Sequence, residues 1–308
     1  MRKTSWRIAQ AVVGAIILFF LVRKFLENWH KVQDQPIQWD LHWEFIVASL
    51  IVTWAMYGVL IWGWRTVLEG WRESLRIVDA ARIWTISSLG GYIPGKVWSI
   101  AGMALMAQQR GVSGTAATGS AVIMQLISIA TGAMIALALV GTPLLDRFLG
   151  GWGSIAAMIL AAVTLIGAVA LTSPSLTRRI GFLLRRPDAI RPVEPGALAG
   201  ALVANLVAWA GYGIALQLLG LGTLHGVELS WSTATGAFAA SYVIGYVFVL
   251  LPAGFGVREA VMITILTPSI GVGPAAALAA ASRVVLTVNQ VGAALPFLLF
   301  RSQPRDIT

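Results

Sequence analysis

Residues Gly90–Gln125 read GGYIPGKVWSIAGMALMAQQRGVSGTAATGSAVIMQ, an apolar run that glycine and proline interrupt near its start. Residues Val249–Val285 read VLLPAGFGVREAVMITILTPSIGVGPAAALAAASRVV and form a degenerate copy of the first stretch. Matching residues recur at one offset of 160 (271 − 111): Gly111 and Gly271, Ala116 and Ala276, Gly132 and Gly292. Paired interrupted segments in the two halves of a chain are typical of a transporter with its substrate site at the middle of the membrane.

The composition is that of a membrane protein. The chain has 308 residues, of which 57% are hydrophobic and only 11% are charged, and its mean hydropathy is +0.79. Too few polar groups remain to cover the surface of a soluble domain. We therefore expect an all-α polytopic membrane protein in which residues 1–308 form a single membrane domain.

The distribution of positive charge favours contact with lipid over contact with nucleic acid. The net charge is +9, and the basic residues cluster beside the apolar stretches, as expected for an anionic leaflet. Counting Lys and Arg in the connections predicts that both termini lie in the cytoplasm. Residues 1–22 lack a small-residue cleavage site, so we expect an uncleaved first span in the cytoplasmic (inner) membrane.

Apolar stretches of sufficient length predict the membrane spans, because a helix needs about 20 residues to cross a bilayer. Six stretches qualify or nearly do: Trp6–Leu26, Trp43–Trp64, Thr115–Val140, Trp152–Leu171, Ala197–Leu219 and Ala275–Phe300. Two further stretches, Arg82–Met106 and Ser232–Thr267, contain the Gly/Pro breaks. From Arg82 to Pro94 is about 12 residues, enough to cross only half a bilayer. Both stretches are therefore predicted to be re-entrant helical hairpins, hairpin one and hairpin two.

The two hairpins are predicted to be inverted relative to each other. Hairpin one enters from the cytoplasm, whereas hairpin two follows three further spans and enters from outside. The repeat halves are then residues 82–140 and 242–300, and such halves supply the two related gates of alternating access. If Trp231–Leu251 crosses completely, the number of spans rises to eight. Between Arg65 and Arg82, apolar residues on one face predict an amphipathic helix lying on the leaflet.

The breaks carry the residues with the clearest binding chemistry. Each precedes a new apolar helix with a cation in its first turn, Lys96 in the first copy and Arg258 in the second. A helix N-terminus offers unpaired N–H groups and a partial positive charge, which suit a phosphate. The glycines and prolines of the breaks are Pro94, Gly95, Pro252, Gly254 and Gly256. Either the two ends form an anion site at mid-membrane, or the cations snorkel to an interface while the glycines permit close packing.

Polar residues within the predicted spans are a second group of candidates. Arg283 lies about 12 Å into the last span, where an ionisable group costs about 2.5 kcal/mol or more and normally has a partner. Glu259 is the best candidate for that partner, so Arg283 either pairs with Glu259 or grips substrate. Four amides also lie within spans: Gln125, Asn205, Asn289 and Gln290. An amide there either clamps two helices together or contacts a ligand.

Several kinds of chemistry are disfavoured. Gly90–Lys96 fits the start of a nucleotide-binding loop, but Val97 stands where Ser or Thr is required. The chain has no Cys, which excludes thiol catalysis and thiolate metal sites. The spans contain no His and supply no set of nucleophile and base. We therefore expect no enzyme activity, no catalytic residues, no metal and no cofactor.

The two motif regions resemble those of a known family. The strings SSLGGYIPGKVWSIAGMALMAQQRGVS and LLPAGFGVREAVMITIL look like signature segments of the flippase-like transmembrane family, named for the lysylphosphatidylglycerol synthetase transmembrane region. The resemblance implies that these residues fill motif positions: Pro94, Gly95, Lys96, Arg110, Pro252, Gly254, Gly256, Arg258 and Glu259. It also implies movement of lipids between leaflets, aminoacylated phosphatidylglycerol in the best-known case and lipid- or polyprenyl-linked anions in others.

The resemblance has one departure. The best-known members add a soluble aminoacyl-transferase domain, whereas this chain stops at Thr308. A stand-alone member without that domain is expected to inherit translocation and not lipid synthesis.

Together these observations predict a flippase for an anionic, phosphate-bearing lipid: a phospholipid, an aminoacyl-phospholipid or a polyprenyl phosphate. One alternative is a membrane scaffold or accessory subunit of a lipid or cell-envelope biosynthetic enzyme. Another is a small-anion transporter. The expected partners are membrane lipids and not nucleic acid; a homodimer and a separate biosynthetic enzyme both stay open.

Overall fold

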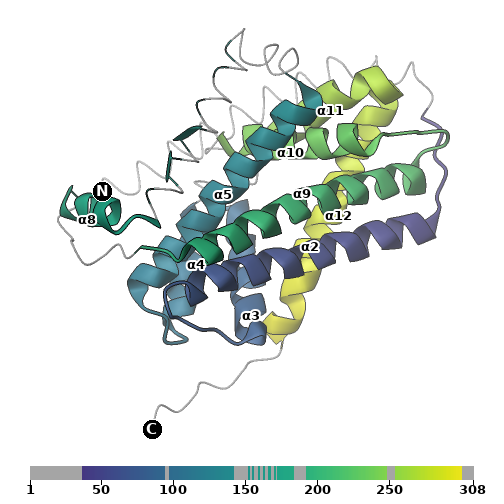
Figure 1. Ribbon diagram of the computed structural model, residues 1–308. Helices are drawn as coiled ribbons and strands as arrows, with labels where there is room; N and C mark the ends of the chain where they lie inside the picture. The colour runs from purple at the N-terminus through teal and green to yellow at the C-terminus, as the bar shows by residue number, and fades with distance from the viewer. Residues whose placement is uncertain are drawn as a thin grey trace, which may run out of the picture.

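The computed structural model describes residues 37–93, 97–141, 173–183, 192–247 and 254–299, with isolated positions between 152 and 172. These residues fold into helices (Figure 1), and one antiparallel bridge joins Trp39 to Leu224. The elements are α2 (Trp43–Glu69), α3 (Ile77–Ser88), η1 (Leu89–Tyr92), α4 (Val97–Gln108), α5 (Gly114–Val140), α8 (Pro174–Leu183), α9 (Pro195–Thr223), α10 (Trp231–Val247), α11 (Val257–Ile270) and α12 (Val272–Leu299).

Four of the described helices are long and apolar enough to cross a membrane: α2, α5, α9 and α12. They coincide with four of the six predicted spans, and they confirm the all-α membrane fold. A helix pairs its own backbone N–H and C=O groups, and this is necessary in a bilayer because lipid chains offer no hydrogen-bond partners. Of the other two predicted spans, Trp6–Leu26 lies outside the described residues and Trp152–Leu171 is described only at isolated positions.

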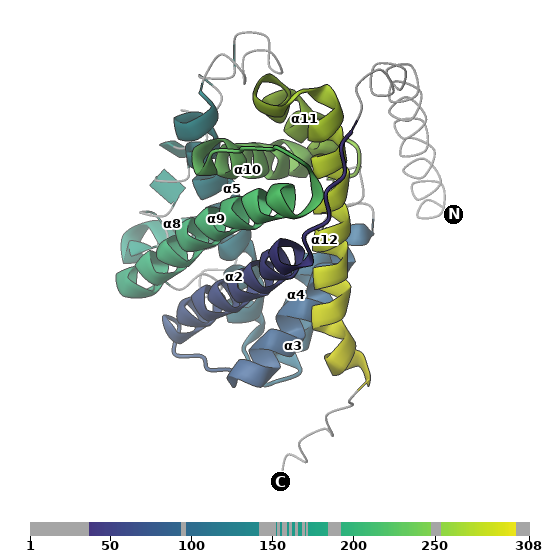
Figure 2. The ribbon, with the colours of Figure 1, turned by 90° about the vertical axis from the view of Figure 1, so that its right-hand side faces the viewer.

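Helices α2 and α9 form an antiparallel pair at the centre of the fold (Figures 1 and 2). Beside the start of α2, the His42 N–H donates to the carbonyl of Gly222, near the end of α9, at 3.0 Å. Further along, a Cβ added to Gly63 would lie only 2.6 Å from the Cβ of Ala204. Small residues at the crossing let the two backbones approach closely, as is usual between membrane helices.

The broken segments form two helical hairpins on either side of this pair. Hairpin one consists of α3, η1 and α4, and hairpin two of α10 and α11, with the helices of each packed against one another. Hairpin one follows the C-terminal end of α2, and hairpin two follows that of α9. Because α2 and α9 are antiparallel, the hairpins enter from opposite ends, and Figure 2 shows them on opposite sides of the pair. An inverted repeat requires this arrangement, although the halves 82–140 and 242–300 stay a prediction.

The turn after each hairpin uses a glycine at equivalent positions. Gly111 follows α4 with φ of 90°, and Gly271 follows α11 with φ of 82°. A residue with a Cβ is strained at these angles, whereas glycine is not. The glycine match at an offset of 160 therefore marks a left-handed residue in the connection to α5 in one half and to α12 in the other, although the first connection is longer.

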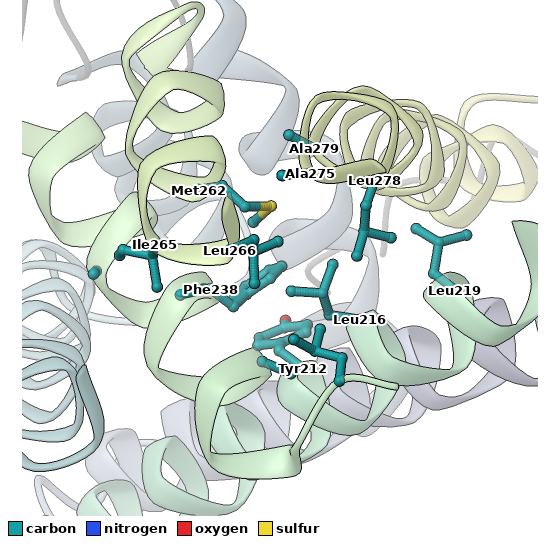
Figure 3. Close-up of a cluster of buried hydrophobic side chains, with 14 of the residues drawn as sticks. Tyr212, Leu216, Leu219, Phe238, Met262, Ile265, Leu266, Ala275, Leu278 and Ala279 are labelled. Atoms are coloured by element: carbon teal, nitrogen blue, oxygen red, sulfur yellow. The ribbon is translucent and has the colours of Figure 1, made fainter. Parts of the chain in front are cut away.

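Two clusters of buried side chains hold the helices together, one beside each hairpin. Figure 3 shows the cluster where α9, α10, α11 and α12 meet, with the Tyr212 and Phe238 rings stacked at 5.0 Å between centroids and Leu278 fully buried. The other cluster lies among α2, α3, α4 and α5. There the buried Trp64 donates from its indole Nε1 to Ser120 Oγ at 2.9 Å. Each hairpin is thus anchored by its own core.

The prediction of an amphipathic helix along residues 65–82 is wrong. The chain in this range ends α2, turns through Arg72 in the left-handed region with φ of 61°, and begins α3. Leu75 is one of the apolar residues on the face predicted to meet lipid, but it is 5% exposed and belongs to the cluster beside hairpin one. An apolar stripe has the same pattern whether it meets lipid or protein, and here it meets protein.

Candidate functional site

A cavity of about 260 Å³ lies between the two hairpins. All the described helices except α8 contribute to its wall. The hairpin residues nearest the breaks that line it are Gly91, Tyr92 and Ser99 from hairpin one, and Gly245, Tyr246 and Arg258 from hairpin two. Sites for small molecules usually enclose about 300–1,000 Å³, so this volume suits a lipid headgroup and not a whole lipid.

Arg258 reaches the cavity wall through a gap that two glycines leave. It lies in the first turn of α11. A Cβ on Gly245 would collide with Arg258 Cγ, and a Cβ on Gly254 would lie 3.2 Å from the same atom. The guanidinium carbon then lies 5.4 Å from the Phe238 ring centroid and 5.5 Å from that of Tyr242. The ring faces attract the cation and hold it at the wall of the cavity.

Arg283 of α12 also lines the cavity and forms the predicted pair with Glu259. Its Nε lies 3.6 Å from Glu259 Oε1, while Glu259 Oε2 accepts a hydrogen bond from the Gly256 N–H at 2.6 Å. The Arg283 guanidinium lies over the Phe255 ring at 5.3 Å. The carboxylate therefore caps α11 and links it to α12, and the pairing still leaves Arg283 in the cavity wall.

Each hairpin forms a hydrogen bond with the long helix of the opposite half, hairpin one with α12 and hairpin two with α5. Tyr92 of hairpin one donates from its hydroxyl to Gln290 Oε1 of α12 at 2.6 Å. Gln125 of α5 donates from Nε2 to the Tyr242 hydroxyl of hairpin two at 3.4 Å. All four residues line the cavity. The wall of the site is thus also the place where the halves bond to each other.

The structure brings together part of the predicted set. The candidates that line the cavity are Gln125, Asn205, Arg258, Arg283 and Gln290. Gly254, Gly256 and Glu259 do not line the cavity but contact residues that position the two arginines: Gly254 lies beside Arg258, and Glu259 binds Gly256 and Arg283. Pro94, Gly95, Lys96 and Pro252 lie outside the described residues.

Two candidates lie away from the cavity. Arg110, at the end of hairpin one, pairs through Nη1 with Asp79 Oδ1 at 2.7 Å. Asn289 is completely buried, and its side-chain amide has no hydrogen-bond partner among the described residues. Its position on α12 turns it away from the face that carries Gln290, because neighbouring residues on a helix point in different directions.

The sequence reasoning missed the aromatic wall of the site. The rings come from five helical elements: Tyr57, Trp84, Tyr92, Trp209, Tyr212, Phe238, Tyr242 and Tyr246. Aromatic residues in apolar helices are most often plain core, so singly they carry little signal. One signal was available, because Tyr242 and Tyr246 are four residues apart and therefore share a helix face. Their rings stack at 6.2 Å.

The fold and the cavity define an integral membrane protein with an internal cavity whose wall includes two arginines. The chain belongs to the transmembrane-region family of lysylphosphatidylglycerol synthase, whose model matches residues 7–288. This family relates the protein to membrane lipids. No curated protein matches the sequence.

Proposed function

We propose that this protein is a translocase that moves an anionic, phosphate-bearing lipid between leaflets of the cytoplasmic membrane. The observation that carries the proposal is the cavity between two oppositely entering hairpins, with Arg258 and Arg283 in its wall. Cations at membrane depth are costly and normally have a task or a partner. Membership of the lipid-related family supports the same function.

In the proposed mechanism the headgroup enters between the hairpins while the acyl chains stay in the bilayer. Its phosphate lies against Arg258, at the start of α11, where the helix end adds further positive potential. Movement of one half against the other then exposes the headgroup to the opposite leaflet. The proposal keeps the predicted cytoplasmic location of both termini, and the proposed activity includes no chemical step.

The test is movement of fluorescent phosphatidylglycerol in vesicles that contain the purified protein. Lys96→Ala and Arg258→Ala should each slow it about tenfold or more, because a charge-assisted hydrogen bond contributes about 1.5–3 kcal/mol. Arg178→Ala is the matched control, since Arg178 is an exposed arginine of α8. Unchanged rates in the Lys96→Ala, Arg258→Ala double variant would contradict the proposal. A wild-type rate no higher than that of empty vesicles, with a tightly retained enzyme, would favour the scaffold instead.

A further inference from the structure

The charge of the cavity wall restricts the headgroups that it accepts. Among the described residues that line the cavity, the charged side chains are the guanidiniums of Arg258 and Arg283, with no carboxylate. The breaks add no acid either, since residues 94–96 read PGK and residues 248–253 read FVLLPA. Glu259 adjoins Arg258 in the chain, but it already accepts a backbone N–H and pairs with Arg283.

The remaining acids of the described chain lie at the two ends of the α2–α9 pair. At one end are Asp40, Glu44 and Glu228, and at the other are Glu69, Glu73, Asp79 and Glu194. A cationic headgroup in the cavity would therefore meet two guanidiniums, of which Arg283 already pairs with Glu259. Like charges in contact are strongly disfavoured, and more so where water is scarce.

The uncharged part of the wall suits hydroxyl groups. Twelve of its side chains carry a hydroxyl or an amide: Ser87, Ser88, Ser99, Ser128, Gln125, Asn205, Gln290, Tyr57, Tyr92, Tyr212, Tyr242 and Tyr246. Such groups both donate and accept hydrogen bonds, as the hydroxyls of a polyol do. The aromatic rings provide apolar surface for the carbon skeleton of the same headgroup, which is the usual composition of a small-molecule site.

We propose that the cavity selects lipids whose phosphate is linked to an uncharged polyol, such as glycerol or a sugar-like ring, and rejects aminoacylated headgroups. This inference rests on the proposed function and narrows its substrate class. It departs from the family description, which refers to a lysylated lipid. A lysyl group adds ammonium charges, and the described residues that line the cavity include no acid to receive them.

The experiment compares four lipids with the same labelled acyl chains in vesicles containing the full chain. Phosphatidylglycerol and phosphatidylinositol carry uncharged polyols, lysylphosphatidylglycerol carries the cationic group, and phosphatidic acid carries phosphate without a polyol. The first two should move about tenfold faster than the lysyl lipid, because of the like-charge penalty. Phosphatidic acid should move several-fold more slowly than phosphatidylglycerol.

Charge reversal sharpens the comparison. Arg258→Glu should lower the rate ratio of phosphatidylglycerol to lysylphosphatidylglycerol about tenfold or more, whereas Arg178→Glu should leave it unchanged. If Arg258→Glu does not fold, Arg258→Gln gives a smaller shift in the same direction. Binding is measured independently, as the increase in Tm caused by short-chain forms of the four lipids.

The outcomes separate the inference from the proposed function. Equal rates for phosphatidylglycerol and its lysyl form overturn the selection while leaving translocation intact. Equal rates for phosphatidic acid and phosphatidylglycerol overturn the polyol part. If no lipid moves faster than in empty vesicles, translocation fails, and the Tm shifts then decide the selection: equal shifts with the lysylated and unmodified lipids overturn it.

Discussion

The half built from α2, hairpin one and α5 and the half built from α9, hairpin two and α12 share one backbone plan. A Cβ on Gly132 of α5 would lie 2.7 Å from the Trp209 indole of α9. Its counterpart on α12, Gly292, faces the indole of Trp54 on α2, with a Cβ there 3.5 Å away. Each long helix thus packs its glycine on a tryptophan of the opposite half, so the two halves hold each other by equivalent contacts.

The same two long helices differ in chemistry where they pass the cavity. At the offset of 160, α12 carries Arg283, Thr287 and Gln290 where α5 carries Ile123, Ile127 and Ala130. The reverse exchange occurs at the cavity wall too, since Gln125 and Ser128 of α5 correspond to Val285 and Val288 of α12. The comparison teaches that a symmetric scaffold supports an asymmetric site: packing needs the shared glycines, while of these two helices α12 supplies the charged residue of the cavity wall, Arg283.

The mouths of the hairpins differ as well. Asp79 closes hairpin one, with its carboxylate 2.7 Å from Arg110 and 2.8 Å from Arg76. The residues at the offset of 160 in hairpin two are Ala239 and Ile270, which are apolar.

Replacing Arg283 of α12 by the residue at the matching position of α5 is expected to have the largest effect on translocation. Arg283→Ile gives α12 the residue of its counterpart Ile123, removes a cation from the cavity wall and leaves Glu259 without its partner. Loss of one member of a buried charge pair costs about 2 kcal/mol or more, so translocation in vesicles should fall about 30-fold or more. Adding Glu259→Gln should recover folded yield without activity. An Arg283→Ile protein with the wild-type rate would show that the asymmetry has no function.

Removing the carboxylate from the mouth of hairpin one is expected to have the next largest effect. Asp79→Asn removes the carboxylate that Arg76 and Arg110 share and should destabilise the protein by about 1–3 kcal/mol, measured by thermal denaturation in detergent. The double variant Asp79→Ala, Arg110→Ile copies the apolar mouth and should recover most of this loss, because apolar replacement of an ion pair is often neutral. If the double variant is no more stable than Asp79→Asn, the two mouths are not interchangeable.

A smaller effect is expected from filling the gap beside Arg258. Gly245→Ala places a methyl group where the Arg258 stem passes, so the guanidinium should shift and translocation should fall about tenfold, equivalent to about 1.4 kcal/mol. Gly58→Ala is the matched control, since a Cβ there meets nothing within 4 Å. A rate for Gly245→Ala equal to that for Gly58→Ala would mean that the position of Arg258 does not matter.

The smallest effect is expected from Asp40, which precedes α2 and bonds to His225, just after α9. Hydrogen bonds from His225 and then His42 hold the pKa of the exposed Asp40 below its ordinary value of 3.8. A carboxyl with a lowered pKa stabilises the fold above its unfolded pKa, and this contribution is lost as the pH falls through the folded value. Asp40→Asn should therefore lower Tm slightly at neutral pH, and the difference from wild type should vanish well below pH 3.8. A Tm difference that persists well below pH 3.8 would show that the ionised Asp40 carboxylate is not its cause.

Part of the site followed from local sequence and part did not. The pairing of Arg283 with Glu259 was one of two open interpretations, because a charge at membrane depth needs a partner and acids are scarce there. Arg110 entered the candidate set through the resemblance alone, and its partner Asp79 is 31 positions away (110 − 79). The aromatic wall was missed because an aromatic residue in an apolar helix has the same pattern in a core as in a cavity.

The sequence by itself determined the membrane class, four of the spans, and the position of both breaks. It could do so because lipid forces each spanning segment to satisfy its own backbone, which leaves long apolar runs, and because glycine and proline end helices locally. Only the tertiary structure decided which side chains share the cavity. Tyr92 meets Gln290, and Gln125 meets Tyr242, because antiparallel packing of α2 and α9 carries the two hairpins to one place. Contacts between helices far apart in the chain depend on that packing, and they produce no periodic pattern in the sequence from which they could be predicted.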